Sequence, residues 1–202
     1  MKKGLKSKRS YVEVVFDGVA TAGVEVVGSE FRECRFVRCA FGETLFRACV
    51  FDDCEFIDCD LSLVKLSHSS FASTRFAGSK VMGVNWSDVR WPSTRLWRPV
   101  SFDRCVLSHC TFLGLDLKGV RFVECTARDV DFREADLSNA DLSGTDLSGA
   151  LFGGTNLSGA NLRGARDYSI DPGRNTLKDA QFSLPEAMSL LSGLDIEIEG
   201  WE

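Results

Sequence analysis

The fold is decided by residues 135–164, which read ADLSN-ADLSG-TDLSG-ALFGG-TNLSG-ANLRG when divided into groups of five. The third residue of each group is Leu or Phe, and the first is Ala or Thr. A period of five fits neither the 3.6-residue period of an α-helix nor the two-residue period of a strand. It requires a chain that turns a corner after each short extended piece and returns the same position to the interior.

The same period extends over nearly the whole chain. All 15 Phe residues share the phase of Leu137, counted in fives from Tyr11 to Leu96 and again from Phe102 to Phe182. We therefore predict an all-β solenoid, with the large residue on the axis and the small one against the wall. Coils spaced by about 4.8 Å would give a rod of roughly 40 Å. The predicted domains are a disordered basic arm over 1–10, the solenoid over 11–182 and a C-terminal capping and dimerisation element over 183–202.

Composition narrows the class of partner. A net charge of −5 and a pI near 5.2 argue against a general nucleic-acid binder, which needs basic excess to neutralise phosphates. No apolar run approaches the length of a membrane-spanning helix, and the basic N-terminal residues precede no apolar signal core. We expect a cytoplasmic protein that contacts neither nucleic acid nor membrane directly.

The eight cysteines are predicted to belong to the core and not to a metal site. Each lies two residues before a position of the five-residue phase, at the small inward position, and their spacing follows the repeat. Zinc sites use shorter gaps of two to four residues. Buried free cysteine behaves as a small hydrophobe, and reduced thiols indicate a reducing compartment. The two histidines fall on outward positions, and no catalytic motif or phosphate loop stands out, so we predict no enzyme activity and no cofactor.

The repeat is interrupted between Leu96 and Phe102, where the step is six residues. One extra residue near Pro99 must bulge outward if both flanking coils keep their register. The bulge is interpreted either as a tolerated irregularity or as a recognition feature. In the second case it would present Trp97 and Arg98, whose residue types are common interface anchors.

The repeat also ends irregularly. Asp167 and Pro172 stand where Leu or Phe is expected, and the phase then resumes. Residues 183–186 read SLPE, which is typical of a helix start. We predict a short helix over about 184–192 and a short strand over 194–198.

The apolar residues of this tail exceed what one small cap needs. The tail is interpreted either as a plain cap or as a cap that also joins two rods end to end in a symmetric dimer. The predicted dimerisation residues are Leu184, Ala187, Met188, Leu190, Leu191, Leu194, Ile196 and Ile198.

Charge is uneven along the chain. Residues 128–150 hold six acids and two bases, so their net charge is −4. The excess is either a by-product of the repeat motif, which uses Asp or Asn before the large residue, or an acidic band for a basic partner. The candidate residues of the band are Asp129, Asp131, Glu134, Asp136, Asp141 and Asp146.

Residues 135–164 closely resemble the A(D/N)LXX motif of the pentapeptide-repeat family, and the resemblance extends over about 11–182. The family implies a right-handed, four-sided β-helix. Within it, the chain resembles the group that protects bacterial DNA gyrase: the Qnr quinolone-resistance type, the mycobacterial type and, most closely, the albicidin-resistance type. Residues 55–63, 83–86 and 182–197 carry this closer likeness. The chain departs from the Qnr pattern because one extra residue replaces long projecting loops.

The resemblance implies a homodimeric, DNA-mimicking rod that binds DNA gyrase, with topoisomerase IV as a further target. Binding would inhibit the enzyme or protect it from a poison such as albicidin or a fluoroquinolone. A net charge of −5 over about 40 Å is far below the one charge per roughly 1.7 Å of a DNA duplex. Mimicry would therefore depend on a local acidic band and on shape. The alternative is a generic interaction scaffold with an unrelated partner.

Overall fold

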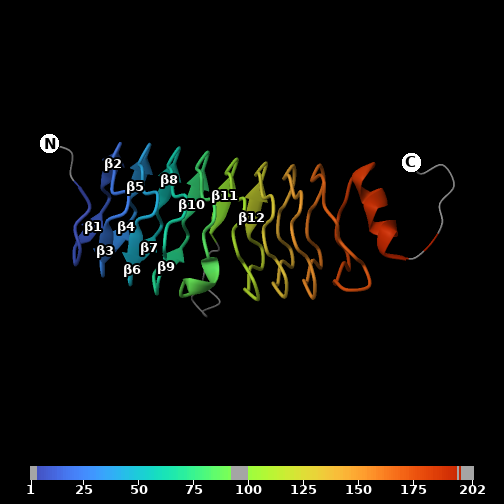
Figure 1. Cartoon of the computed structure of the whole chain (residues 1–202). Helices are drawn as coiled ribbons and strands as arrows, with labels where there is room; N and C mark the ends of the chain where they lie inside the picture. Colours follow the sequence, from blue (N-terminus) through green and yellow to red (C-terminus); the bar gives the residue numbers. More distant parts are fainter. Residues whose placement is uncertain (1–3, 92–99, 195, 197–202) are drawn as a thin grey trace.

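A computed structural model describes residues 4–91, 100–194 and 196. The chain winds into a rod of stacked coils, with its two termini at opposite ends (Figure 1). Extended pieces of successive coils pair in parallel and in register, as Tyr11 does with Phe31 and Phe31 with Phe51. The predicted four-sided β-solenoid is confirmed.

Four columns of paired pieces form the sides of the rod, which we number faces 1 to 4 in chain order. Face 1 holds β1, β4, β7 and β9, face 2 holds β2, β5, β8, β10, β11 and β12, and face 4 begins with β3 and β6. Face 3 consists of single bridges from Ala20 to Arg166. The strands are β1 (Ser10–Val12), β2 (Val15–Asp17), β3 (Glu25–Val27), β4 (Glu30–Arg32), β5 (Arg35–Val37), β6 (Leu45–Arg47), β7 (Val50–Asp52), β8 (Glu55–Ile57), β9 (Ser70–Ala72), β10 (Arg75–Ala77), β11 (Ser101–Asp103) and β12 (Arg121–Val123).

Most corners contain a left-handed residue. The second residue after the buried large one has positive φ, for example 53° at Glu33 and 68° at Gly149. This conformation favours Gly, Asn and Asp, which explains why glycine recurs at this position in the C-terminal half. The Glu33 N–H also donates to the Asp52 carbonyl of the next coil at 2.9 Å. The corners are therefore fixed by backbone hydrogen bonds as well as by the core.

Stacked aromatic rings fill the axis. On face 2 the rings of Phe36 and Phe56 lie 4.5 Å apart and those of Phe102 and Phe122 lie 5.2 Å apart, nearly parallel in both pairs. Rings on neighbouring faces meet edge to face, as Phe36 and Phe31 do at 5.4 Å. Both arrangements suit the quadrupole of an aromatic ring. The period of five thus stacks aromatic rings of successive coils on faces 1, 2 and 4.

The small inward residues form a second ladder through their side chains. Ser69 Oγ donates to the Phe46 carbonyl at 2.9 Å and accepts from the Cys49 N–H at 3.0 Å. Thr145 makes the corresponding pair of bonds, to the Phe122 carbonyl and from the Cys125 N–H. The wall positions therefore link coils by hydrogen bonds, in addition to filling space.

The N-terminal end differs from the expected disordered arm over 1–10. The Lys8 N–H donates to the Val27 carbonyl at 2.7 Å, and the Val27 N–H donates to Ser7 Oγ at 3.0 Å. Leu5 packs against the core. These bonds let residues 5–9 cover one side of the first coil.

The C-terminal end carries a 3₁₀ helix, η2 (Glu186–Leu194), in place of the predicted helix over about 184–192. Ser183 Oγ accepts from the Gly164 N–H of the solenoid at 3.2 Å, so the Ser183 side chain ties the cap to the rod. The predicted strand over 194–198 lies largely outside the described residues. Tyr168 and Ile170 are buried in the last coil, whereas Asp167 is exposed. The core therefore continues into the last coil, but its buried residues no longer fall at the five-residue positions that the repeat predicts.

Candidate interaction surface

The coil between β10 and β11 is longer than the others. Phe76 pairs in register with Phe102, and Asn85 on face 4 pairs with Thr111 by the same longer step. Trp91 is the last inward residue of face 1 in this coil, and Val100 is the first inward residue of face 2. Eight residues separate them, whereas two residues separate the corresponding positions in other coils, such as Phe71 and Thr74. This corner therefore contains six residues more than the corresponding corner of the other coils.

The predicted one-residue bulge, and the predicted absence of a longer interruption, are wrong. The sequence phase assigned the place of Phe102 on face 2 to Leu96, because a leucine happens to stand five residues after Trp91. Trp97 and Arg98 lie in 92–99, outside the described residues. The structure therefore locates the segment that holds them between Trp91 and Val100, and does not describe their side chains.

The acidic run lies around the rod and not along one face. Asp131, Asp136, Asp141 and Asp146 each precede a buried residue, and they occupy faces 4, 1, 2 and 3 in turn. Residues five apart stand on neighbouring faces, whereas residues separated by a whole coil share a face. The six candidate acids are consequently a ring and not a band.

These four aspartates have a structural role. Each accepts a hydrogen bond from the backbone N–H two residues later, as Asp136 does from Ser138 at 3.0 Å and Asp141 from Ser143 at 3.2 Å. Such turns stabilise the step from face to corner. The repeat motif uses Asp or Asn before the large residue for this reason.

Basic side chains also neutralise the four aspartates. Asp131 pairs with Arg133 of its own coil at 2.7 Å. Lys118 Nζ lies 3.3 Å from Asp136, which belongs to the next coil. The Arg121 guanidinium lies 3.1 Å from Asp141 in the same way. Counting the charges of residues 128–150 alone misses Lys118 and Arg121, because these two bases belong to the preceding coil.

Asp146 is the most deeply buried of the four, with 1% of its side chain exposed. Burial by itself would raise its pKa, but hydrogen bonds from Ser148 and Arg128 lower the pKa of Asp146 to about 2. Arg128 donates to one carboxylate oxygen through two nitrogens, at 2.9 and 2.8 Å. Arg166 approaches the same oxygen from the next coil at 3.4 Å. Asp146 thus links the coil before its own to the coil after it.

Asp129 and Glu134 are exposed at two different corners. Asp129 lies between faces 3 and 4 and is 3.7 Å from His109 Nδ1. Glu134 lies between faces 4 and 1. These are the acids of the run that project into solvent, and they do not lie together.

Sequence reasoning missed a different group of carboxylates, which we call the acidic corner. Glu13, Glu33 and Asp53 occupy the same corner of three successive coils, between faces 1 and 2, and Asp52 stands beside Asp53. All four are exposed, and the ion pairs of the described residues include none of them. The extra residues of the longer coil also fall between faces 1 and 2. A search for acids repeated at the spacing of one coil would have found this column.

All eight cysteines are buried and free, as predicted for core residues. Cys49 Sγ donates to the Val26 carbonyl at 3.3 Å, which is the bond that serine makes at the same position elsewhere. Among the described residues, no group of three His, Cys, Asp or Glu side chains is arranged to hold a metal ion.

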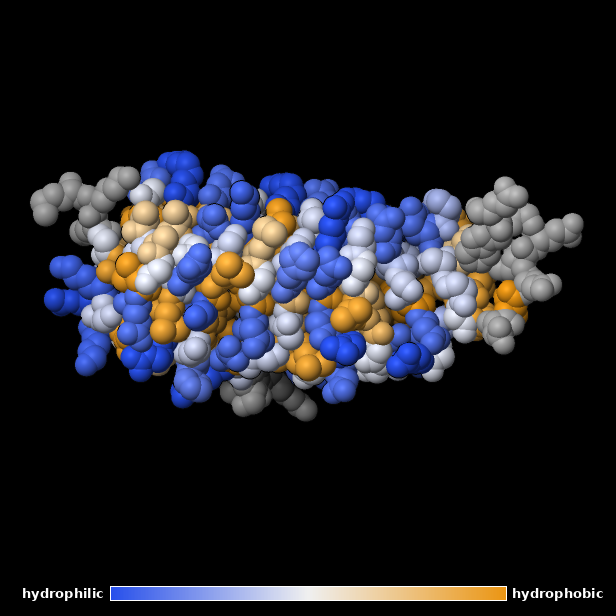
Figure 2. All heavy atoms as spheres, in the orientation of Figure 1, coloured by the Kyte–Doolittle hydropathy of each residue, from blue (hydrophilic) through white to orange (hydrophobic). Residues whose placement is uncertain are grey.

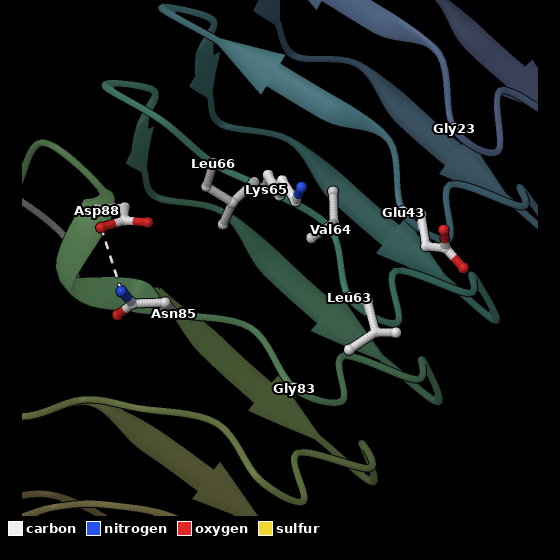
Figure 3. Close-up of a pocket in the computed structure, with 9 residues that line it drawn as sticks. All are labelled: Gly23, Glu43, Leu63, Val64, Lys65, Leu66, Gly83, Asn85 and Asp88. Atoms are coloured by element: carbon white, nitrogen blue, oxygen red, sulfur yellow. Dashed lines mark hydrogen bonds between the residues drawn. The ribbon is translucent and has the colours of Figure 1, made fainter.

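A hollow of about 520 Å³ opens beside face 4, where its lining residues come from four coils (Figure 3). Exposed Leu63 leans over Gly83, where an added Cβ would lie 2.6 Å from the leucine Cδ2. Lys65 lies on the coil of Leu63, and Glu43 and Asp88 flank it. One turn of 3₁₀ helix, η1 (Trp86–Asp88), bounds the hollow.

The cap presents apolar side chains to solvent. Leu184 is 76% exposed, Met188 39%, Leu194 48% and Ile196 55%, whereas Leu190 packs against the core. Apolar residues are visible at this end of the rod in Figure 2. Of the other predicted dimerisation residues, Ala187 and Leu191 are half-buried and Ile198 lies outside the described residues.

No helix among the described residues has the length and apolar character needed to cross a membrane.

Comparison with known proteins identifies the family. The profile described as a pentapeptide repeat region matches residues 29–99 and 85–162, more than half of the chain. The chain therefore belongs to the pentapeptide-repeat family. A search among proteins of curated function gave no significant match.

The solenoid is also similar to solved structures of QnrB1, a plasmid-mediated fluoroquinolone resistance protein. Full-length QnrB1 has 19% identity and a TM-score of 0.55, with 93% of this chain and 100% of that chain covered. For a trypsin-treated variant the identity is 18% and the TM-score 0.56, with 96% and 99% covered. At this identity the likeness shows the fold.

Proposed function

We propose that this protein binds DNA gyrase, with topoisomerase IV as a second target. Binding inhibits the enzyme or protects it from a poison such as albicidin or a fluoroquinolone. The observation that carries the proposal is the end-to-end match with QnrB1, which covers 96% of this chain and 99% of the other. QnrB1 is described as a fluoroquinolone resistance protein, and the proposal transfers that role to this rod.

The protein acts by binding and not by catalysis. Its interior is filled by rings and small side chains, and its outward positions are mostly polar. The proposed partner is an enzyme that holds DNA, so it offers a basic surface complementary to an acidic rod.

The acidic corner supports DNA mimicry better than the ring of aspartates does. Its four unpaired carboxylates span two coil steps, which is about 10 Å at the strand spacing. A DNA duplex carries about six charges over the same length. The local charge density therefore approaches that of DNA, although the density of the whole rod does not.

Further contacts come from the other predicted residues. Exposed Asp129 and Glu134 add negative charge on other corners, whereas the four ion-paired aspartates mainly maintain the coils. Trp97 and Arg98 belong to the longer coil, whose extra residues fall between faces 1 and 2, as the acidic corner does, two coils beyond Asp53. We therefore assign them to the same contact with gyrase.

The cap joins two rods into a homodimer. The exposed Leu184, Met188, Leu194 and Ile196 are the apolar residues that a second copy would cover. The target acts on chromosomal DNA, and the eight free thiols suit a reducing environment, so we place the dimer in the cytoplasm.

A supercoiling assay with purified gyrase tests this proposal, with and without albicidin or a fluoroquinolone. Protein that restores supercoiling in the presence of one poison is a protector, and the poison shows its specificity. Inhibition without rescue supports a DNA mimic that lacks a protective role. No effect of folded protein at micromolar concentration would contradict the proposal and favour a scaffold with another partner.

A further inference from the structure

Two cysteine thiols lie one above the other in neighbouring coils of face 3. Cys39 and Cys59 each precede one member of the parallel bridge between Ala40 and Asp60, so they share one register. The Cys39 N–H donates to Cys59 Sγ at 3.4 Å. The spacing of stacked strands, about 4.8 Å, lies within the Cα–Cα range of about 4.4–6.8 Å found in disulfides.

Hydrogen bonding does not require cysteine at these positions. Cys59 Sγ donates to the Phe36 carbonyl at 3.3 Å, and Ser79 Oγ makes the corresponding bond to Phe56 at 3.2 Å in the next coil. Serine and threonine serve the same purpose at Ser69 and Thr145. Two stacked thiols add a chemistry that the hydroxyls lack, which is two-electron oxidation to a disulfide.

We propose that Cys39 and Cys59 form a site of oxidative modification, at which a peroxide links two coils through a disulfide. The Cys39 thiolate attacks one peroxide oxygen, so an S–O bond forms, the O–O bond breaks, and the oxygen that leaves takes up a proton as water. Cys59 sulfur then attacks the sulfenic sulfur, so the S–S bond forms, the S–O bond breaks, and a second water leaves. The two thiols lose two electrons, and one peroxide gains them.

Two other stacked pairs provide an internal comparison. Cys34 and Cys54 directly precede the paired residues Arg35 and Glu55. Cys105 and Cys125 directly precede the bridged residues Val106 and Thr126. The Cys39–Cys59 pair differs in that the Cys39 N–H donates to its partner's sulfur, and the hydrogen bond from the Cys59 thiol, which outweighs burial here, lowers the pKa of the Cys39 thiol.

In the other two pairs, burial favours the neutral thiol. It raises the pKa of Cys54 to about 12, of Cys105 to about 11 and of Cys125 to about 12, and it also raises the pKa of Cys34. Because the thiolate is the nucleophile, Cys39 reacts first.

Two of the four carbonyls that accept from these thiols also have backbone donors. Cys39 and Cys59 also donate to the carbonyls of Val37 and Ile57. These carbonyls keep backbone donors, from the Gly18 N–H and the Arg38 N–H, each at 2.9 Å. Oxidation therefore removes the thiol hydrogen bonds, including those to the Phe16 and Phe36 carbonyls, and adds a covalent link between the two coils, while the backbone bonds from Gly18 and Arg38 remain.

Peptide mapping of the full chain tests the site. The native protein is incubated with hydrogen peroxide, quenched, unfolded in an alkylating reagent and digested for mass spectrometry. We expect one disulfide, joining Cys39 to Cys59, six alkylated cysteines, reversal by a reductant and a higher Tm for the oxidised protein. The proposal is overturned by eight alkylated thiols, by sulfinic acid without a disulfide, or by equal or faster linkage of Cys34 to Cys54.

Serine variants provide the matched control. Cys39→Ser should abolish both the disulfide and the rise in Tm, whereas Cys34→Ser should leave both unchanged. Serine already stands at this position in other coils, for example Ser69 and Ser79, so both variants should fold, which circular dichroism checks. If either variant fails to fold, the mapping of the unsubstituted protein still decides the question.

Discussion

Phe76 and Phe102 stack with their ring centroids 4.9 Å apart, although the longest coil of the rod separates them in sequence. Their β-strands pair in register, so the solenoid continues across the long coil without a break in face 2. The core therefore determines the register in which the chain continues after the six extra residues. This arrangement lets the corner carry an insertion while the flanking coils keep their packing.

Replacing Phe102 with Ala should destabilise the rod strongly. The ring is fully buried between Phe76 and Phe122, and the cavity left by such a truncation costs about 3–5 kcal/mol. Urea unfolding followed by circular dichroism measures the change. Leu113→Ala is the control, because Leu113 is 40% exposed and its loss should change stability by about 0.5 kcal/mol or less. Equal effects of the two substitutions would contradict the assigned register.

Asp146 should make stability depend on pH in the acid range. Its folded pKa of about 2 lies below the unfolded value of about 3.9, so the unfolded state binds more protons between these values. The contribution, about 2 kcal/mol, is complete above pH 4 and disappears as the pH falls through 2. Unfolding of the parent protein and of Asp146→Asn should therefore differ at pH 6 and converge near pH 2. A difference that does not change with pH would refute the ion-pair assignment; Asp116→Asn, at an exposed carboxylate, is the control.

Neutralising the acidic corner should weaken gyrase binding. The triple substitution Glu13→Gln, Glu33→Gln and Asp53→Asn removes three unpaired charges from one corner and should lower affinity about tenfold, with a smaller dependence on salt. Surface plasmon resonance with immobilised gyrase measures both effects.

The control for this triple variant removes the same charge from other corners, through Asp58→Asn, Glu124→Gln and Glu43→Gln. It should bind gyrase nearly as well as the parent protein. If the two triple variants lose affinity equally, net charge and not the acidic corner governs binding.

Charged residues on the cap should separate the dimer. Leu184→Glu with Met188→Lys places charges on two exposed apolar positions without changing the buried core. Light scattering after size-exclusion chromatography should show a monomer with an unchanged Tm. Leu113→Glu with Leu151→Lys, at exposed leucines of face 4, should stay dimeric. A cap variant that remains dimeric would place the interface elsewhere.

The sequence alone predicts the solenoid because its period is strong and local. Every Phe from Phe16 to Phe152 is buried or nearly so where the phase of five puts it. The same phase failed at Leu96, since a five-residue pattern cannot distinguish a residue inside a coil from an apolar residue that falls in phase within an insertion. Only the pairing of Phe76 with Phe102 locates the insertion.

The candidate acids illustrate a second limit. Asp136 and Asp141 are neighbours in the sequence pattern, but they stand on different faces and pair with bases of the preceding coil. The four-sided geometry predicts this separation, and it also predicts the column of Glu13, Glu33 and Asp53. Tyr168 and Ile170 were missed because the phase shifts at Asp167, where a corner residue with positive φ replaces a buried one.

The most direct test of the central claim, that the rod replaces DNA on gyrase, is a competition measurement. Fluorescently labelled protein is bound to purified gyrase at low salt, and unlabelled DNA duplex is titrated while the anisotropy is followed. The account predicts that the duplex displaces the protein completely, and that the acidic-corner triple variant is displaced at lower DNA concentrations. Anisotropy that stays high at saturating DNA would show that protein and DNA bind together, and would contradict DNA mimicry.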